Sequence, residues 1–170
     1  MFLTADPHLY HHRLAVKRGY QSIDDMHCDI VTKWNGKISK RDTVYMLGDV
    51  TMLNKPDMIE PVLKKLNFKE LILIRGNHDR KKIIELGVFS GVYDYKEINY
   101  GGNLIVLSHY PFATWNKSHR GSLNIHGHSH GKYRMSSQQM DAGMDTNDMY
   151  PYHITECIAK MKSLATAPTI

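Results

Sequence analysis

The chain has 170 residues, a formal net charge of +5 from 22 basic and 17 acidic residues, and 42% hydrophobic residues. This length and composition predict one globular domain over residues 1–170 and exclude disordered, collagen-like and fibrous classes. No apolar run approaches the roughly 20 residues that span a bilayer. Asp6 comes too early for the apolar core of a secretion signal. The positive charge suits an anionic partner without requiring one.

Cysteine and histidine usage narrows the chemistry further. The two cysteines, Cys28 and Cys157, exclude a disulfide framework and a thiolate zinc site. We therefore expect a reducing, cytoplasmic setting and no membrane partner. The 11 histidines are an unusual number for this length, and histidine is both the commonest metal ligand and a frequent acid or base. Their positions relative to the predicted strands therefore matter.

Strands and helices alternate in the first half of the predicted order. Apolar runs predict buried strands at residues 1–5, 43–47, 70–74, 103–107 and 122–125, a hairpin arm at 93–100, and further strands at 139–144 and 153–158. Helical patterns predict one helix capped by Ser22 and stopped at Gly36, one over 57–66 with Pro61 in its first turn, and one over 80–86. Residues 165–170 are expected to fray. This order predicts an α/β sandwich with a mixed sheet.

Five of the predicted strands run directly into polar residues of the kinds that bind metal ions. These residues are Asp6 and His8, Asp49, Asn77 with His78 and Asp79, His109, and His128 with His130. Sites in open α/β sheets form at the carboxyl ends of strands, so we expect these side chains to converge. In extended chain, residues two apart point to one side, which would align each of the two spaced pairs. The two spaced pairs, together with Asp49, Asn77 and His109, make seven nitrogen and oxygen donors, which suit two ions that share a carboxylate better than one tetrahedral ion.

Each of these residues also has an ordinary structural interpretation. A histidine after a strand is commonly a surface or packed residue, Gly48-Asp49 can form a turn, and Asn77-His78-Asp79 can cap the next helix. These interpretations would have to hold independently at five strand ends, so a shared metal site is favoured. The glycines at 48, 76 and 127 would let backbone approach closely beside the ligands.

The remaining histidines and the tryptophans do not share this placement. His11 and His12 fall in the loop after the first pair, where one could face a substrate or both could be solvated. His27 is expected to be structural or exposed, His126 to pack, and His119 and His153 have no assigned role. Trp34 is expected in the core. Trp115, in the loop over 111–121, could stack on a substrate or pin the loop.

The order D-x-H, G-D, G-N-H-D, a single H and G-H-x-H over positions 6–130 resembles the calcineurin-like metallophosphoesterase superfamily. The closer resemblance is to its small single-domain bacterial and phage phosphoesterases, because Trp34-Asn35 precedes the second motif. Val50-Thr51-Met52 follows that motif, which disfavours the protein phosphatase branch and its Asp-Arg-Gly. The resemblance implies a four-layer α/β/β/α sandwich with two mixed sheets and a binuclear metal site at the carboxyl ends of strands.

The resemblance also implies a role for each matched residue. One metal would be held by Asp6, His8, Asp49 and His130, and the other by Asp49, Asn77, His109 and His128, with Asp49 bridging. His78 would contact the scissile phosphate or protonate the leaving oxygen, with Asp79 as its orienter. Asn77, His78, His11 and Trp115 are the candidate substrate-binding residues. This donor set suits Mn²⁺ above all, with Fe²⁺, Ni²⁺ or Zn²⁺ as alternatives.

Together these features predict a metal-dependent phosphoester hydrolase, specifically a phosphodiesterase that uses a hydroxide activated by two divalent metals. Its expected substrate is a small phosphoester such as a nucleotide, or a nucleic acid. Two alternatives are a phosphomonoesterase and a non-catalytic interaction domain, as in the retromer subunit with this fold. The presence of His78 disfavours the interaction domain. A nucleic-acid-binding module has no supporting helix-turn-helix or zinc-finger spacing. The sequence determines neither the natural substrate nor the oligomeric state.

Overall fold

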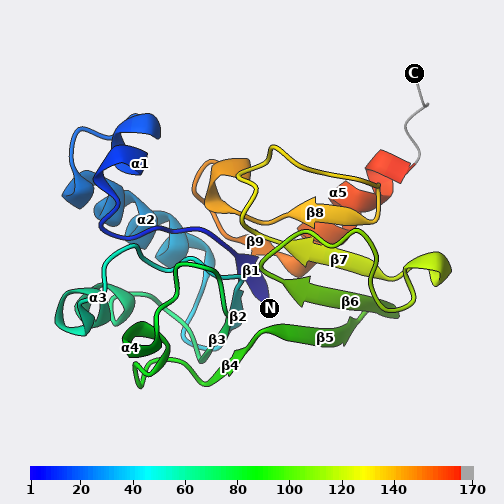
Figure 1. Cartoon of the computed structure of the whole chain (residues 1–170), viewed down its shortest axis with the longest axis horizontal. Helices are drawn as coiled ribbons and strands as arrows, with labels where there is room; N and C mark the ends of the chain where they lie inside the picture. The colour runs from blue at the N-terminus through cyan, green and yellow to red at the C-terminus, as the bar shows by residue number, and fades with distance from the viewer. Residues whose placement is uncertain (166–170) are drawn as a thin grey trace.

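The computed structural model describes residues 1–165, which form two mixed β-sheets with helices around them (Figure 1). The first sheet has the order β4 (Gly91–Tyr93), β3 (Glu70–Ile74), β2 (Thr43–Met46), β1 (Phe2–Thr4), β9 (Tyr152–His153), and only β9 is antiparallel to its neighbour. The second has the order β5 (Tyr95–Tyr100), β6 (Asn103–Ser108), β7 (Leu123–His126), β8 (Gln139–Asp141), and only β5 is antiparallel. The predicted α/β fold with two mixed sheets is confirmed. No helix within residues 1–165 is long and apolar enough to cross a bilayer.

Alternating side chains divide the interior into two cores. In and just after β2, Val44 and Met46 join one core, whereas Tyr45 and Leu47 join the other. The first core lies between the first sheet and the helices α1 (His12–Lys17), α2 (Ile23–Lys37), α3 (Pro56–Leu63) and α4 (Lys81–Ile84). The second core lies between the two sheets and includes α5 (Ile154–Ala165), which contacts the edge strands β8 and β9. This arrangement leaves the carboxyl ends of the parallel strands free to build a site.

Helices α2 and α3 form largely where the sequence predicts them. The Ser22 side chain accepts a hydrogen bond from the Asp25 amide, which confirms the predicted cap, and Trp34 is fully buried as expected. The predicted stop at Gly36 is wrong, because α2 continues to Lys37 before Ile38 turns extended. Pro61 is the sixth residue of α3 and not in its first turn, and the helix ends two residues later.

Two segments differ from the prediction in kind. The strand predicted over 153–158 is wrong, because only His153 belongs to a strand and the chain then enters α5. Ile154, Cys157, Ile158 and Met161 are all buried, and their spacing is that of one helix face. The loop expected to hold His12 instead contains α1, which His11 caps. Residues 166–170 of the tail expected to fray lie outside the described part of the chain.

His27 fastens α2 to the chain that follows β1. Its Nε2 atom accepts a hydrogen bond of 3.1 Å from the Tyr10 amide, and the two rings pack edge to face at 4.5 Å. Burial lowers the pKa of His27 below its usual value, although Asp24 partly opposes this. Only the neutral ring can accept this hydrogen bond. His27 was expected to be structural or exposed, and its contacts give it the structural role.

We predict that His27→Gln reduces the loss of stability on acidification. Glutamine can keep the acceptor for Tyr10 but does not titrate. In the wild type, below the ordinary histidine pKa of about 6.5, the unfolded state binds more protons than the folded state. The free energy of unfolding therefore falls as the pH drops through that value, by at most about 1.4 kcal/mol per pH unit. Urea unfolding in EDTA at pH 7.5 and 5.5 measures the difference. Identical pH dependence of the two proteins would contradict the assignment.

Candidate metal centre

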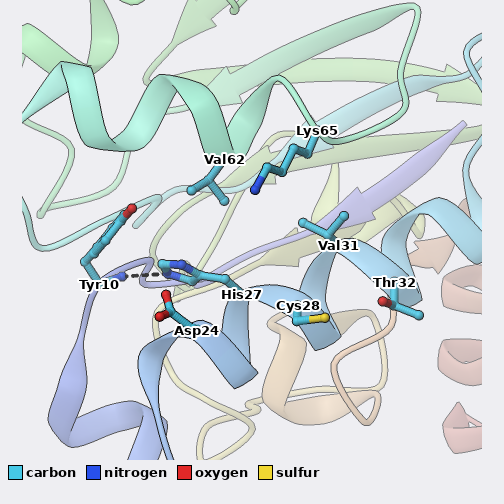
Figure 2. Close-up of a pocket in the computed structure, with 8 residues that line it drawn as sticks. All are labelled: Tyr10, Asp24, His27, Cys28, Val31, Thr32, Val62 and Lys65. Atoms are coloured by element: carbon cyan, nitrogen blue, oxygen red, sulfur yellow. Dashed lines mark hydrogen bonds between the residues drawn. The ribbon is translucent and has the colours of Figure 1, made fainter.

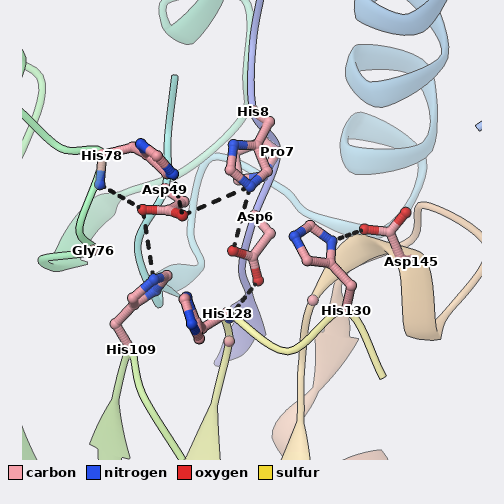
Figure 3. A network of polar contacts seen from close by, with 12 residues as sticks. Asp6, Pro7, His8, Asp49, Gly76, His78, His109, His128, His130 and Asp145 are labelled. Carbon is pink, nitrogen blue, oxygen red and sulfur yellow. Dashed lines mark hydrogen bonds and ion pairs between the residues drawn. The ribbon is translucent and has the colours of Figure 1, made fainter. Parts of the chain in front are cut away.

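Six of the seven side chains predicted to bind metal meet at one place, beyond the ends of strands from both sheets (Figure 3). Two groups of three donors form there, each with its ligand atoms within 4.8 Å of one another. The first group is Asp6, His8 and His130, and the second is Asp49, His109 and His128. They follow β1, β2, β6 and β7, so strands from both sheets contribute. The predicted convergence at strand ends is therefore present in the structure.

Asp49 lies between the two groups and faces both. Its Oδ2 atom is 3.7 Å from Nε2 of His8, and its Oδ1 atom is 3.5 Å from Nε2 of His109. The same His109 nitrogen is 3.0 Å from Oδ1 of Asn77, which brings Asn77 into the second group. Nε2 of His8 is also 3.7 Å from Oδ1 of Asp6. A carboxylate with one oxygen toward each group has the arrangement expected of a bridging ligand.

The chemical state of these donors fits a bound cation. Oδ1 of Asp6 and Nδ1 of His8 are buried and have no hydrogen-bond partner among the described residues. Such groups are costly to bury, and a cation between the donors would satisfy the carboxylate oxygen. Burial raises the pKa of Asp6 to about 7 and lowers the pKa of His8 to about 3. Carboxylate, amide and imidazole donors suit divalent ions of intermediate to hard character.

Left-handed backbone aims most of these side chains. Nine non-glycine residues in the described part of the chain have positive φ, and five of them are predicted ligands. The five are Asp6, His8, Asp49, His128 and His130, with φ between 48° and 67°. Non-glycine residues adopt this region at a cost, and such residues cluster at functional sites. The two residues of each pair are therefore aimed at the centre by left-handed backbone. The extended backbone that was predicted for these pairs is wrong.

Glycines at 48, 76 and 127 allow the loops to approach one another, as expected. A Cβ atom at Gly76 would lie 2.3 Å from Oδ1 of Asp49, closer than any side chain allows. A Cβ atom at Gly127 would lie 2.6 Å from the Ala5 Cβ and 2.9 Å from Oδ2 of Asp6. Any larger residue would therefore displace the two aspartates on which the centre is built.

Asp79 is buried behind the centre and binds backbone. Its Oδ2 accepts hydrogen bonds from the amides of Asp49 at 2.9 Å and Gly76 at 2.8 Å, and its Oδ1 accepts one from Val50 at 2.8 Å. Within the described residues, no hydrogen bond joins it to the ring of His78, which it was expected to orient. Asp79 thus positions the two loops that carry Asp49 and Asn77.

A pair of residues that the sequence did not indicate supports the first donor group. Nδ1 of His130 is 2.6 Å from Oδ2 of Asp145, which leaves Nε2 of His130 for a metal (Figure 3). Arg18 binds both oxygens of Asp145 at 2.8 and 2.7 Å and donates to the Asp6 carbonyl at 2.7 Å. Arg18 and His130 together hold the pKa of Asp145 well below its usual range, despite its burial. One buried guanidinium thus fixes two of the three donors.

Histidines and a tryptophan considered for substrate binding lie at different distances from the centre. The His78 side chain is 40% exposed, with Nε2 3.9 Å from Oδ2 of Asp49, so it lies at the mouth. His11 uses Nδ1 to cap α1, yet its ring is 5.8 Å from the ring of His8. Nε1 of Trp115 donates to the Ser122 carbonyl at 3.2 Å, which supports the interpretation that Trp115 pins its loop.

A cavity of about 390 Å³ lies away from these donors, between α2 and α3 (Figure 2). It is lined by His27, Cys28, Val31, Val62 and Lys65, among others. It contains none of the predicted ligands, so it is separate from the metal centre. His126 lies at the end of β7, fully buried as its predicted packing role requires.

We predict that Asp145→Asn weakens binding of one of two Mn²⁺ ions by about 10–100-fold, because amide nitrogen and oxygen cannot both hold Arg18 and orient His130 as the carboxylate does. Titration calorimetry on the metal-free protein measures both affinities. Asp148→Asn is the matched control, since the Asp148 side chain is 86% exposed and pairs with Lys33. Two unchanged affinities in Asp145→Asn would show that the carboxylate does not support a ligand.

Several known proteins are similar to this chain. The model of the "Calcineurin-like phosphoesterase superfamily domain" matches residues 21–144. An uncharacterized protein of Methanocaldococcus jannaschii is 29% identical over 78% of this chain and 70% of its own. A protein of Mycobacterium phage D29 is 26% identical over 89% of this chain and 91% of its own.

A solved structure, a protein of unknown function from Aquifex aeolicus, superposes with a TM-score of 0.74 at 27% identity and covers 94% of this chain and 97% of its own. The family match begins after the first motif, so Asp6 and His8 are placed in the centre by geometry. The family model covers more than half of the chain. This chain belongs to the calcineurin-like phosphoesterase superfamily.

Proposed function

We propose that this protein is a metal-dependent phosphoester hydrolase that acts on phosphodiesters with two divalent ions, preferably Mn²⁺. The observation that carries the proposal is the pair of three-donor groups, in which Asp49 belongs to the second group and also faces the first, with His78 at their mouth. Asp6, His8, Asp49 and His130 would hold one ion, and Asp49, Asn77, His109 and His128 the other. When bound, such ions neutralise the phosphoryl oxygens and lower the pKa of the attacking water.

The residues of the chain supply positioning and a proton. The His109 Nδ1 atom is 2.7 Å from the Leu47 carbonyl, which fixes the ring with Nε2 toward Asp49. The His78 amide donates to Oδ1 of Asp49 at 2.9 Å, so its backbone is fixed while its ring stays accessible. A half-exposed imidazole at the mouth can contact a substrate oxygen and donate a proton to the leaving group.

Charge at the centre favours a diester over a monoester. A monoester carries a second negative charge, which guanidinium groups commonly bind. Arg18 lies next to the donors, but its side chain is only 4% exposed. Its nitrogens are already bonded to Asp145 and to the carbonyls of Asp6 and Pro7, so it cannot meet a substrate oxygen. Arg75, beside the second donor group, is already paired with Asp94, so the singly charged phosphodiester fits this centre better.

We predict that His78→Ala lowers kcat for glycerol 1,2-cyclic phosphate by about 10²–10⁴-fold, because the alkoxide leaving oxygen of this phosphodiester loses its proton donor. Mn²⁺ content by elemental analysis should stay at the wild-type level, since His78 is not among the donors. His119→Ala, at an exposed position in the loop before β7, is the control and should keep full activity. Full activity of His78→Ala would overturn the assigned role.

Two further outcomes of the same assays would point to other functions. Release of phosphate from nucleoside monophosphates, with the diester left intact, would make the protein a phosphomonoesterase. Binding of Mn²⁺ without turnover of any phosphoester in a broad panel, including cyclic nucleotides and single-stranded DNA, would make it an interaction domain.

A further inference from the structure

A small hollow opens beside the second donor group. It encloses about 250 Å³, and Asn77 and His109 form part of its wall. These are the two residues whose Oδ1 and Nε2 atoms lie 3.0 Å apart next to Asp49. A group that fills the hollow would therefore lie directly beside a phosphoryl group at the centre. The hollow is thus placed to bind the part of a substrate attached to the phosphate.

Two aromatic side chains line this hollow and leave ring surface uncovered. Tyr110 is 48% exposed, and its ring packs edge to face on His128 at 4.5 Å and on His109 at 5.1 Å. Phe112 is half-buried, and its ring centroid is 6.1 Å from that of Tyr95. Exposed aromatic surface in a concave site is suited to stacking on another planar ring.

Buried polar side chains hold the aromatic segment in place. The Ser108 hydroxyl donates to the Tyr110 carbonyl at 2.8 Å, and Nε2 of Gln139 donates to the Phe112 carbonyl at 2.9 Å. Oδ1 of Asn124 accepts from the Phe112 amide at 3.4 Å. Asn124 and Gln139 are fully buried, so this segment is held by interior polar side chains of the second sheet. A segment fixed in this way loses little freedom when a ligand binds.

The lining of the hollow also includes charged side chains. Arg75 and Asp94 line it and pair with each other at an exposed position. A guanidinium offers hydrogen-bond donors and a flat face, and a carboxylate offers acceptors, so together they can meet the mixed edge of a heterocycle. The volume is below the usual range for drug-sized ligands, which leaves room for one ring system but not for a lipid chain.

We propose that this hollow binds the nucleobase of a nucleotide-type phosphoester, with the base stacked on Tyr110 and Phe112. The proposal rests on the proposed function, because it assigns the substrate class of the same centre. Stacking on aromatic side chains accepts any base, so the hollow selects nucleotides as a class without selecting a sequence.

The test uses the full-length Mn²⁺-loaded protein. It compares two cyclic phosphodiesters that contain the same cyclic phosphate ring. Adenosine 2′,3′-cyclic phosphate carries a base, and glycerol 1,2-cyclic phosphate does not. The wild type should show a KM about ten-fold lower for the nucleotide. Phe112→Ala and Tyr110→Ala should each raise that KM about ten-fold and leave the KM for the glycerol ester unchanged. Tyr110→Phe keeps the ring and should behave as wild type.

Controls separate a binding role from a structural one. Tyr133→Ala removes an exposed tyrosine that lines a different hollow and should change neither KM. Tyr110 also contacts His128, so the Mn²⁺ content is measured in every variant. If Tyr110→Ala binds less Mn²⁺ than the wild type, the test is decided by Phe112→Ala. Equal effects on both substrates, or no preference of the wild type for the nucleotide, would overturn the proposal.

Failure of the proposed function would look different. If the wild type hydrolyses neither ester, that function fails, and equilibrium binding then decides the assignment of the hollow. Adenosine 5′-monophosphate should bind the Mn²⁺-loaded protein more tightly than glycerol 3-phosphate does, and Phe112→Ala should abolish the difference. Equal binding of the two probes would overturn the assignment.

Discussion

The centre depends on one buried carboxylate, that of Asp79, and on the three amides that donate to it. These amides belong to Asp49, Val50 and Gly76, so a single side chain ties the loop after β2 to the loop after β3. Burial and, to a lesser extent, the charge of Asp49 raise the pKa of Asp79, and the hydrogen bonds from the amides oppose that shift. Without the carboxylate, three buried donors would lack partners, at about 1–3 kcal/mol each. The position of Asp49 therefore follows from a residue that belongs to neither donor group.

The same loop junction explains why the motifs could be recognised from the sequence. Glycine at 48 and 76 and an acidic residue at 79 are needed so that two backbones can approach and be joined. These requirements are local, and they leave residues of fixed type at fixed spacing. The parallel strands that carry the loops can also be predicted from short stretches of sequence, because buried strands of such a sheet are short apolar runs. Both the strand ends and the donors at them were therefore predictable.

What the sequence did not predict involves contacts over long separations. Arg18 and Asp145 are 127 residues apart, and neither lies in a pattern that indicates a partner. The positive φ angles of Asp6 and His8 arise because the loop after β1 is held against the loop after β2 by backbone bonds, such as that from the His8 amide to the Asp49 carbonyl. Helix α5 is a different case. Its buried residues recur at helical spacing in the sequence, but they also form a short apolar run of the length of a strand, and a strand was predicted from that run.

The two halves of the centre differ in their contact with solvent. In the first donor group, Asp6 and His8 are buried, and Arg18 and Asp145 hold the group from behind. In the second, Asp49 and His109 are also buried, but His128 and the adjoining Asn77 are exposed. A buried, braced site exchanges its ligands with difficulty, whereas an exposed one can accept an oxygen from outside. Substrate should therefore approach from the side of the second group, which is also the side on which Tyr110 packs against His109 and His128. Binding of the phosphate and recognition of the group attached to it would then occur on one face, while the other face provides rigidity.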